Sequence, residues 1–173
     1  MLEAFIRWWN GNDKAKLEKL ARAAWVYGNS ARDEATESKK YLLTAQSEHS
    51  HFMRKNDPKS YTSIKRAKDN SVFMIKLARK ECARVEDVVR ELKEIQAKNK
   101  SNSRFTERNA IQQELDHAEL HRVQAYSAVK EMMEIDNEVE RLWRECNDRF
   151  LHSHVTRNGL AVQHRTLSHG DRG

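Results

Sequence analysis

Three histidines are candidate metal ligands. Each lies three residues from a glutamate or four residues from another histidine. Glu48-x-x-His51 and Glu114-x-x-His117 each place a carboxylate and an imidazole three residues apart. This is the spacing used by carboxylate-bridged di-iron helical bundles. His117 and His121 lie four residues apart, so both could bind one metal ion from a single face of a helix.

Other catalytic chemistry has little support in the sequence. The chain contains two cysteines, Cys82 and Cys146, which give neither a zinc-binding spacing nor a disulfide framework. No glycine-rich phosphate loop and no nucleophile elbow occurs. We therefore expect no catalytic residue and no small-molecule substrate, and we do not expect an enzyme.

The composition predicts long helices. Of the 173 residues, 38% are hydrophobic and 34% are charged, which suits the narrow apolar stripe of a packed helix. One proline and five glycines leave few breaks, and no window alternates apolar and polar residues as a half-buried strand does. No apolar run reaches the ~18–20 residues that cross a bilayer, and the N-terminus does not resemble a signal peptide. We expect a reducing intracellular compartment, the cytoplasm, or a virion.

Turn and cap residues set the expected boundaries. Asn56-Asp57-Pro58 reads as a helix end, a cap and a helix start, while Gly11-Asn12-Asp13, 99–103 and Asn158-Gly159 mark further breaks. The predicted fold is all-α: an antiparallel bundle or coiled coil of three long helices, a short N-terminal amphipathic helix and an irregular C-terminal tail. The expected segments are the N-terminal helix at 1–10, the bundle at 13–155 with helices near 14–55, 59–98 and 106–155, and a basic tail at 156–173.

The third long segment shows the clearest periodicity. Twelve residues follow an unbroken spacing of four and three, and ten of them are apolar or weakly polar. They are Ile111, Leu115, Ala118, Arg122, Ala125, Val129, Met132, Asp136, Val139, Trp143, Cys146 and Phe150. A sustained repeat of 3.5 residues is typical of coiled coils.

An approximate register follows if the chain folds back at Asp57 and Ser101, because short connections make neighbouring helices antiparallel. Residue n of the first helix should then lie level with about 114 − n of the second and about 88 + n of the third. This register places Arg122 beside Glu34 and Glu81, which predicts a structural polar layer that fixes the register.

The same register predicts a second polar layer and a charge match. Asp136 should lie beside Glu48, His49 and either Lys65 or Lys68. Residues 54–80 carry a charge of +7 and residues 131–148 a charge of −5. The register places 131–148 beside 54–71, so we expect the basic segment to face an acidic neighbour within the chain.

The register also bears on the candidate metal sites. Glu114 falls level with about residue 26, which is roughly 33 Å from Glu48 at about 1.5 Å per residue. One metal centre cannot use both Glu-x-x-His pairs. His117 and His121 lie beside the core stripe rather than in it. We therefore expect solvated charged faces, no metal site and no cofactor.

Both ends of the chain carry candidate docking residues. Leu2, Phe5, Ile6, Trp8 and Trp9 offer more aromatic and aliphatic area than is usually left in water. This segment could pack on the bundle, dock on a partner subunit or lie in a membrane interface. The tail contributes further candidates with charged and apolar side chains: Arg157, Leu160, Val162, Arg165 and Leu167.

We expect a non-enzymatic structural or assembly subunit, a helical rod or spacer in a larger protein complex such as a virus or phage particle. Its partners would be protein subunits, including copies of itself. The alternative is a basic nucleic-acid-binding protein, favoured by the isoelectric point near 9.4 and by a stripe of Lys65, Lys68, Lys76 and Arg79. A second alternative is a peripheral membrane protein that uses residues 1–9.

Overall fold

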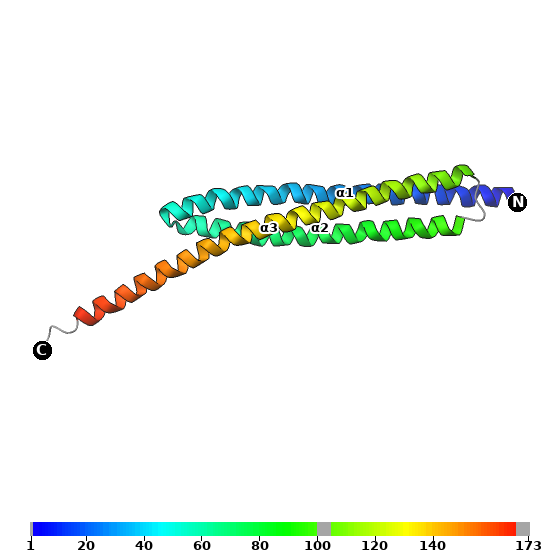
Figure 1. The fold of residues 1–173 in the computed structure, drawn as a ribbon. Helices are drawn as coiled ribbons and strands as arrows, with labels where there is room; N and C mark the ends of the chain where they lie inside the picture. Colours follow the sequence, from blue (N-terminus) through cyan, green and yellow to red (C-terminus); the bar gives the residue numbers. More distant parts are fainter. Residues whose placement is uncertain (1, 100–104, 169–173) are drawn as a thin grey trace. The chain divides into compact units, whose positions relative to one another are not determined.

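The protein folds into three long helices (Figure 1). The computed structural model describes the backbone of residues 2–99 and 105–168, and the side chains of residues 14–98 and 108–153. Helix α1 spans Leu2–Lys55, α2 spans Pro58–Asn99 and α3 spans Phe105–Ser168, with no strand in these ranges. The predicted all-α, antiparallel three-helix architecture is confirmed.

Two of the expected helix boundaries differ from those in the structure. Helix α1 continues through Gly11-Asn12-Asp13, so the prediction of a separate N-terminal helix is wrong. Helix α3 continues through Asn158-Gly159 to Ser168, so the prediction of an irregular tail from residue 156 is wrong over that range. The physical reason is that glycine lowers helix stability by only about 1 kcal/mol, which flanking helix-forming residues can offset.

The turn between α1 and α2 follows the predicted cap chemistry. Asn56 has a positive φ of 53°, and its N–H donates to the Phe52 carbonyl, which closes α1. The Asp57 carboxylate accepts from the Lys59 N–H at 3.2 Å and from the Ser60 hydroxyl at 3.3 Å. Asp57 is therefore the N-cap of α2, and the proline at the first helical position has no N–H to satisfy.

The chain divides into two compact units, each built from a part of all three helices. Unit 1 comprises Met1–Ser38 and Phe73–Met133, and unit 2 comprises Lys39–Val72 and Glu134–Gly173. Each unit has a core of its own. No helix in the described part of the chain is both long enough and apolar enough to cross a membrane.

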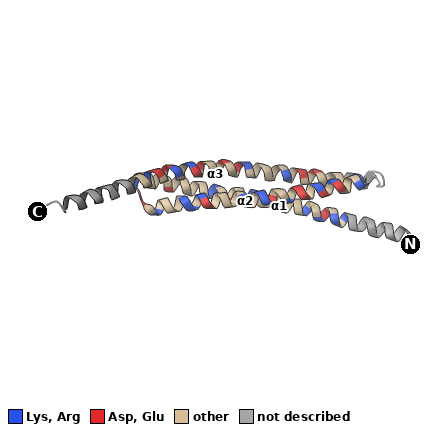
Figure 2. Ribbon diagram, turned by 90° about the horizontal axis from the view of Figure 1, so that it is seen from below, with Lys and Arg blue, Asp and Glu red and all other residues tan. Residues whose placement is uncertain are grey.

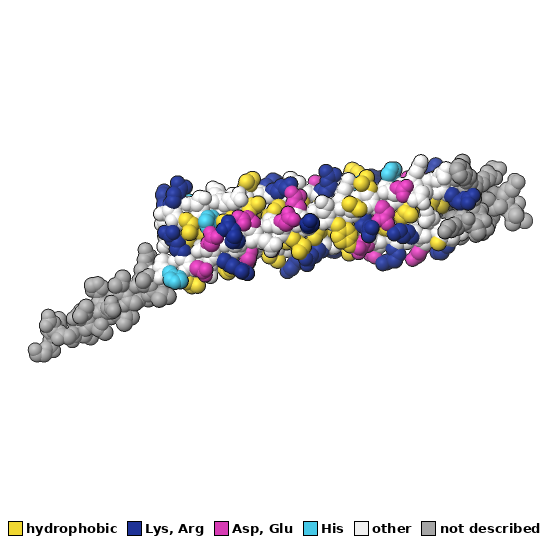
Figure 3. Space-filling view, in the orientation of Figure 1, with side chains coloured by type: hydrophobic (Ala, Val, Ile, Leu, Met, Phe, Trp, Pro, Cys, Tyr) yellow, Lys and Arg dark blue, Asp and Glu magenta, His cyan; other side chains and the backbone are white. Residues whose placement is uncertain are grey.

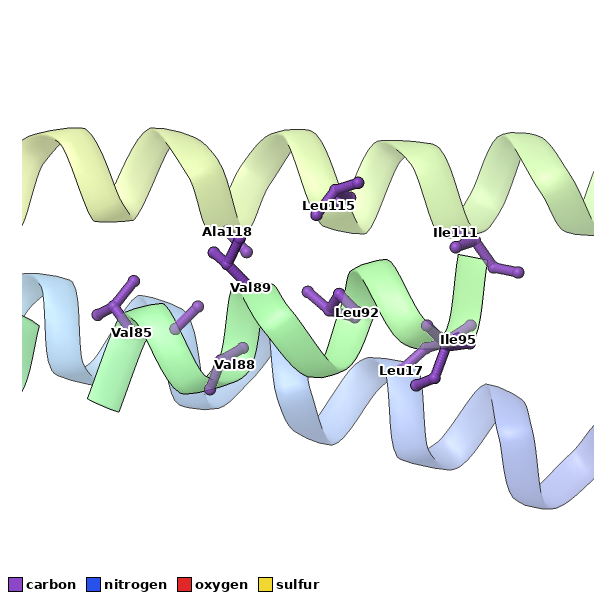
Figure 4. Close-up of a cluster of buried hydrophobic side chains, with 10 residues drawn as sticks. Leu17, Val85, Val88, Val89, Leu92, Ile95, Ile111, Leu115 and Ala118 are labelled. Atoms are coloured by element: carbon purple, nitrogen blue, oxygen red, sulfur yellow. The ribbon is translucent and has the colours of Figure 1, made fainter. Parts of the chain in front are cut away.

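Unit 1 contains two clusters of buried side chains. The first brings together branched aliphatic residues of α2 with residues of α1 and α3 (Figure 4). Its members are Leu17, Ala24, Val85, Val88, Val89, Leu92, Ile95, Ile111, Leu115 and Ala118. The second cluster is rich in alanine and consists of Ala31, Ala35, Ile75, Ala78, Cys82, Ala125, Ala128, Val129 and Met132. The small side chains let the helix backbones approach closely there.

Unit 2 has a core with larger side chains. It contains Ala45, Phe52, Ile64, Ala67, Ile135, Val139, Leu142 and Cys146. The ring of Tyr61 stacks on Phe150 with centroids 4.6 Å apart, and the Tyr61 hydroxyl donates to Asn147 Oδ1 at 2.8 Å. The apolar positions of the predicted repeat in α3 are mostly buried in the two units, which confirms that stripe as the core face.

Candidate binding groove

A groove runs between α2 and α3 in unit 1. Its volume is about 420 Å³. Helix α2 contributes Arg79, Cys82, Ala83 and Glu86, and α3 contributes Tyr126, Val129, Lys130 and Met133. The spacings of three, four and seven residues follow from the helical repeat, which brings these positions to one side of each helix.

Two polar contacts cross the groove. The Tyr126 hydroxyl donates to Glu86 Oε1. This hydrogen bond raises the pKa of Tyr126, and burial and the negative charge of Glu86 act in the same direction. Arg79 Nη2 donates to the sulfur of Met133 at 3.6 Å. Both contacts join α2 to α3, and they hold the two walls at a defined separation.

Cys82 lies at the base of the groove and is buried. Burial raises the pKa of its thiol to about 11, and the charges of Glu86, Glu34 and Glu81 contribute further. The thiolate is the nucleophilic form, so burial favours the less reactive protonated thiol of Cys82 at neutral pH. In unit 2, burial likewise raises the pKa of Cys146 to about 11, and both thiols are free.

The outer face of α3 in unit 1 carries a row of exposed apolar side chains that we call the α3 row. Leu120 is 54% exposed, Val123 60%, Tyr126 46% and Met133 43%. The residues follow each other at intervals of three, three and seven, so each lies near the next on the outer side of α3, and the row drifts around the helix along its length. Figure 3 shows hydrophobic side chains among charged ones on one face of the described molecule. Sequence reasoning missed this row because it followed only the buried stripe.

The predicted polar layer is found in part. Glu34 and Glu81 are close enough in unit 1 for the charge of Glu81 to act on Glu34. Burial first, then the charges of Glu81 and Asp33, raise the pKa of Glu34 to about 7. Glu34 Oε2 is buried and has no hydrogen-bond partner among the described residues.

The basic member of that layer was assigned wrongly. Arg84 Nη1 donates to both carboxylate oxygens of Glu81, at 2.8 and 3.1 Å. Arg122 instead donates from Nε to Glu119 Oε2 at 2.6 Å, and Lys93 pairs with the same carboxylate at 2.7 Å. Each arginine has a glutamate three residues earlier on its own helix, and such a local pair orders fewer groups than a pair across the bundle.

The second predicted layer is also wrong, because the register differs. In unit 2, His49 pairs with Glu145 at 2.9 Å, a separation of 96 positions where we expected about 88. The difference of eight residues is about two helical turns. Asp136 consequently accepts from the Ser71 hydroxyl at 2.8 Å rather than meeting His49. The packing of core side chains, not symmetry about the two turns, sets this register.

The proposed nucleic-acid stripe falls in both units, and its members have different environments. Lys68 in unit 2 pairs with Glu140 at 2.6 Å and lies 3.7 Å above the Trp143 ring, so its charge is already neutralised within the chain. This pair agrees with the expected match between the basic and acidic segments. Lys65 is exposed in unit 2, and Lys76 and Arg79 are exposed in unit 1. Figure 2 shows that Lys and Arg are interspersed with Asp and Glu along the helices.

The histidines of the candidate metal motifs have other neighbours. His117 Nδ1 lies 3.7 Å from Glu114, and His51 Nε2 lies 3.9 Å from Asp57. His121 packs against Gly28. Within residues 14–98 and 108–153, no three His, Cys, Asp or Glu side chains are grouped to hold a metal ion.

The predicted docking residues at the two ends lie outside the described side chains. They are Leu2, Phe5, Ile6, Trp8, Trp9, Arg157, Leu160, Val162, Arg165 and Leu167. No protein-family model matches the chain, and no curated protein or solved structure matches it either.

Proposed function

We propose that this protein is a non-enzymatic assembly subunit that docks on other protein subunits, including copies of itself, through the exposed apolar surface of unit 1. The α3 row carries this proposal. Single exposed apolar side chains are ordinary on protein surfaces. Four of them following one another on the outer side of one helix are less ordinary, and larger groups of exposed apolar side chains mark sites of protein association.

The environments of Cys82 and Glu119 in unit 1 support a binding role over a catalytic one. The buried thiol of Cys82 has a raised pKa, which lowers its reactivity at neutral pH. The carboxylate of Glu119 is held by Lys93 and Arg122, and these contacts lower its pKa. These groups are fixed in states that stabilise the bundle rather than in states that transfer protons or attack a substrate.

Light scattering on the full chain tests the proposal. We expect the solution mass at about 100 μM to exceed the 20.3 kDa of one chain. The substitution Leu120→Asp should lower that mass, because it places a charge in the α3 row without touching a residue that lines the groove. Leu43→Asp is the matched control, since Leu43 is 65% exposed but belongs to unit 2. A mass of one chain at every concentration would contradict the docking of copies of the chain on one another through the α3 row.

Nucleic-acid binding is a second candidate function. The net charge of +6 favours it, as do the exposed cations Lys65, Lys76 and Arg79. Binding of a duplex through these residues requires the logarithm of affinity to fall with the logarithm of salt concentration. A titration at several salt concentrations, with Lys76→Ala expected to reduce the slope by about one phosphate contact, distinguishes this function from protein docking.

A further inference from the structure

We infer that the groove between α2 and α3 in unit 1 binds an acidic amphipathic helix of a protein partner. This inference rests on the proposed function, because it names the kind of surface that one docking partner presents. It depends on three properties of the groove, which are its shape, its apolar lining and the charge of its rim.

The shape of the groove suits a helix. Its two walls are helices α2 and α3, and a helix bound there would lie over the Tyr126–Glu86 and Arg79–Met133 contacts that join them. Tyr126 and Met133 lie seven residues apart on α3, which is about 10 Å along the axis. Ala83 leaves room between the walls because its side chain is a single methyl group. A third helix laid against two others fills such a furrow with anchors at positions i, i+3 or i+4 and i+7.

The lining offers apolar contacts of the kind that such anchors use. Tyr126 and Met133 are nearly half exposed, while Val129 is buried beneath them. Methionine adapts its shape to different partners, and tyrosine contributes a large rigid surface at low entropic cost. Val123 extends the apolar surface by one turn beyond Tyr126. A partner helix therefore finds about three turns of apolar surface to cover.

Basic side chains outnumber acidic ones around the groove. Arg79 and Lys130 line the groove, and Lys76 lies one turn before Arg79 on α2. Arg79 donates to the Met133 sulfur rather than to a carboxylate. No ion pair engages Arg79, Lys130 or Lys76 among the residues whose side chains the structure describes. Glu86 is the one acidic residue that lines the groove, and its carboxylate accepts from Tyr126. Acidic side chains on the partner helix would match this rim.

A synthetic peptide tests the inference. The probe is a fluorescently labelled helix of about 18 residues, with leucine along one face and glutamate on the others. Its binding to the full chain is measured by anisotropy, with the protein below the concentration at which it associates with itself. We expect the glutamate peptide to bind at least tenfold more tightly than the same peptide with lysine in place of glutamate. A scrambled glutamate peptide without the leucine face should bind at least tenfold more weakly.

Two variants locate the binding. Arg79→Glu combined with Lys130→Glu should reverse the preference between the glutamate and lysine peptides. The matched control combines Lys19→Glu with Arg22→Glu, which makes the same charge change at exposed positions of α1 in unit 1. Ala83→Trp should weaken binding of both peptides by filling the groove. Circular dichroism confirms that each variant remains helical.

The possible results separate the inference from the proposed function. Equal binding of the ordered and scrambled glutamate peptides would overturn the inference, as would an unchanged preference in the Arg79→Glu, Lys130→Glu variant. If the peptide results overturn the inference but the chain still associates with itself and Leu120→Asp prevents this association, the proposed function stands without the inference. If the glutamate peptide binds the groove of a chain that never associates, the inference stands and the docking of copies on one another falls.

Discussion

Glu34 is an ionisable group placed where its charge is unfavourable. Its pKa is raised to about 7 from 4.5, by burial and by the nearby charges of Glu81 and Asp33. A carboxyl whose folded-state pKa lies above its unfolded-state pKa stays protonated longer in the folded state. Its contribution to stability is therefore fully present below pH 4.5 and is lost as the pH rises through about 7.

Replacing Glu34 with glutamine should remove this pH dependence. We expect Glu34→Gln to raise the free energy of unfolding at pH 8 by about 1 kcal/mol, after allowance for partial solvent screening. The difference from the wild type should shrink towards zero near pH 4.5. Urea unfolding followed by circular dichroism at both pH values measures it.

Glu94→Gln is the control for that experiment, because Glu94 is an exposed carboxylate of the same unit. Its effect should be small and nearly equal at the two pH values. If Glu34→Gln destabilised the protein equally at both, the ionised Glu34 carboxylate would not be the source of the cost, and loss of a favourable contact would explain the result instead.

The sequence predicted the location of this pair but not its counter-charge. Glu34 and Glu81 interrupt the apolar stripes of their helices, and that pattern alone brings them to the interior. The choice between Arg84 and Arg122 as the arginine beside Glu81 depends on the rotamers of both arginines and on the carboxylates near each of them. The periodicity of the sequence contains no information about rotamers or about competing carboxylates.

At the scale of helices, α1 and α3 approach each other closely at Gly28 in unit 1. A Cβ atom added there would lie 3.0 Å from His121 Cβ and 3.2 Å from the His121 carbonyl oxygen. Neither atom can move without moving α3. A Cβ there would be in tighter than ordinary contact with α3, so packing in unit 1 favours glycine at position 28, although glycine is a poor residue for the middle of a helix.

Gly28→Ala brings two opposing effects together. Alanine favours the helix by about 1 kcal/mol, whereas overpacking costs about 1–3 kcal/mol. We expect the clash to outweigh the gain and the free energy of unfolding to fall by about 1 kcal/mol, as measured by urea denaturation.

Ala15→Gly measures the helix propensity term alone, because Ala15 is exposed on the same helix and in the same unit. Its loss of stability should be about 1 kcal/mol. If Gly28→Ala stabilised the protein by the amount that Ala15→Gly destabilises it, the close approach to His121 would have no energetic consequence.

Helix boundaries and helix register differ in how far the sequence determines them. Asp57 and Pro58 provide local hydrogen-bonding and steric signals, so the start of α2 was predicted to within one residue. The register between α1 and α3 is a property of side-chain packing across two chain segments, and the prediction missed it by about two turns. The groove follows from the register, and it could not be derived from the sequence for the same reason.

At the scale of the whole molecule, the two units have separate cores although they share the same three helices. Phe52 is fully buried in unit 2, and Leu92 is fully buried in unit 1. The buried clusters of one unit contain no residue of the other among the described side chains. Regions with their own cores commonly open with their own free energies.

Hydrogen exchange measured by mass spectrometry should reveal this division. Phe52→Ala removes a large buried ring and should lower local stability by about 3–5 kcal/mol, so amides of 39–72 and 134–153 should exchange faster. Leu92→Ala, at a cost of about 2–5 kcal/mol, should instead accelerate exchange in 14–38, 73–98 and 108–133. The two substitutions are each other's controls, because each deletes a fully buried side chain of the same bundle.

Equal acceleration of exchange throughout the chain by both variants would mean that the continuous helices couple the units into one cooperative structure. Acceleration confined to the substituted unit would mean that partner binding at the groove of unit 1 can leave the stability of unit 2 unchanged.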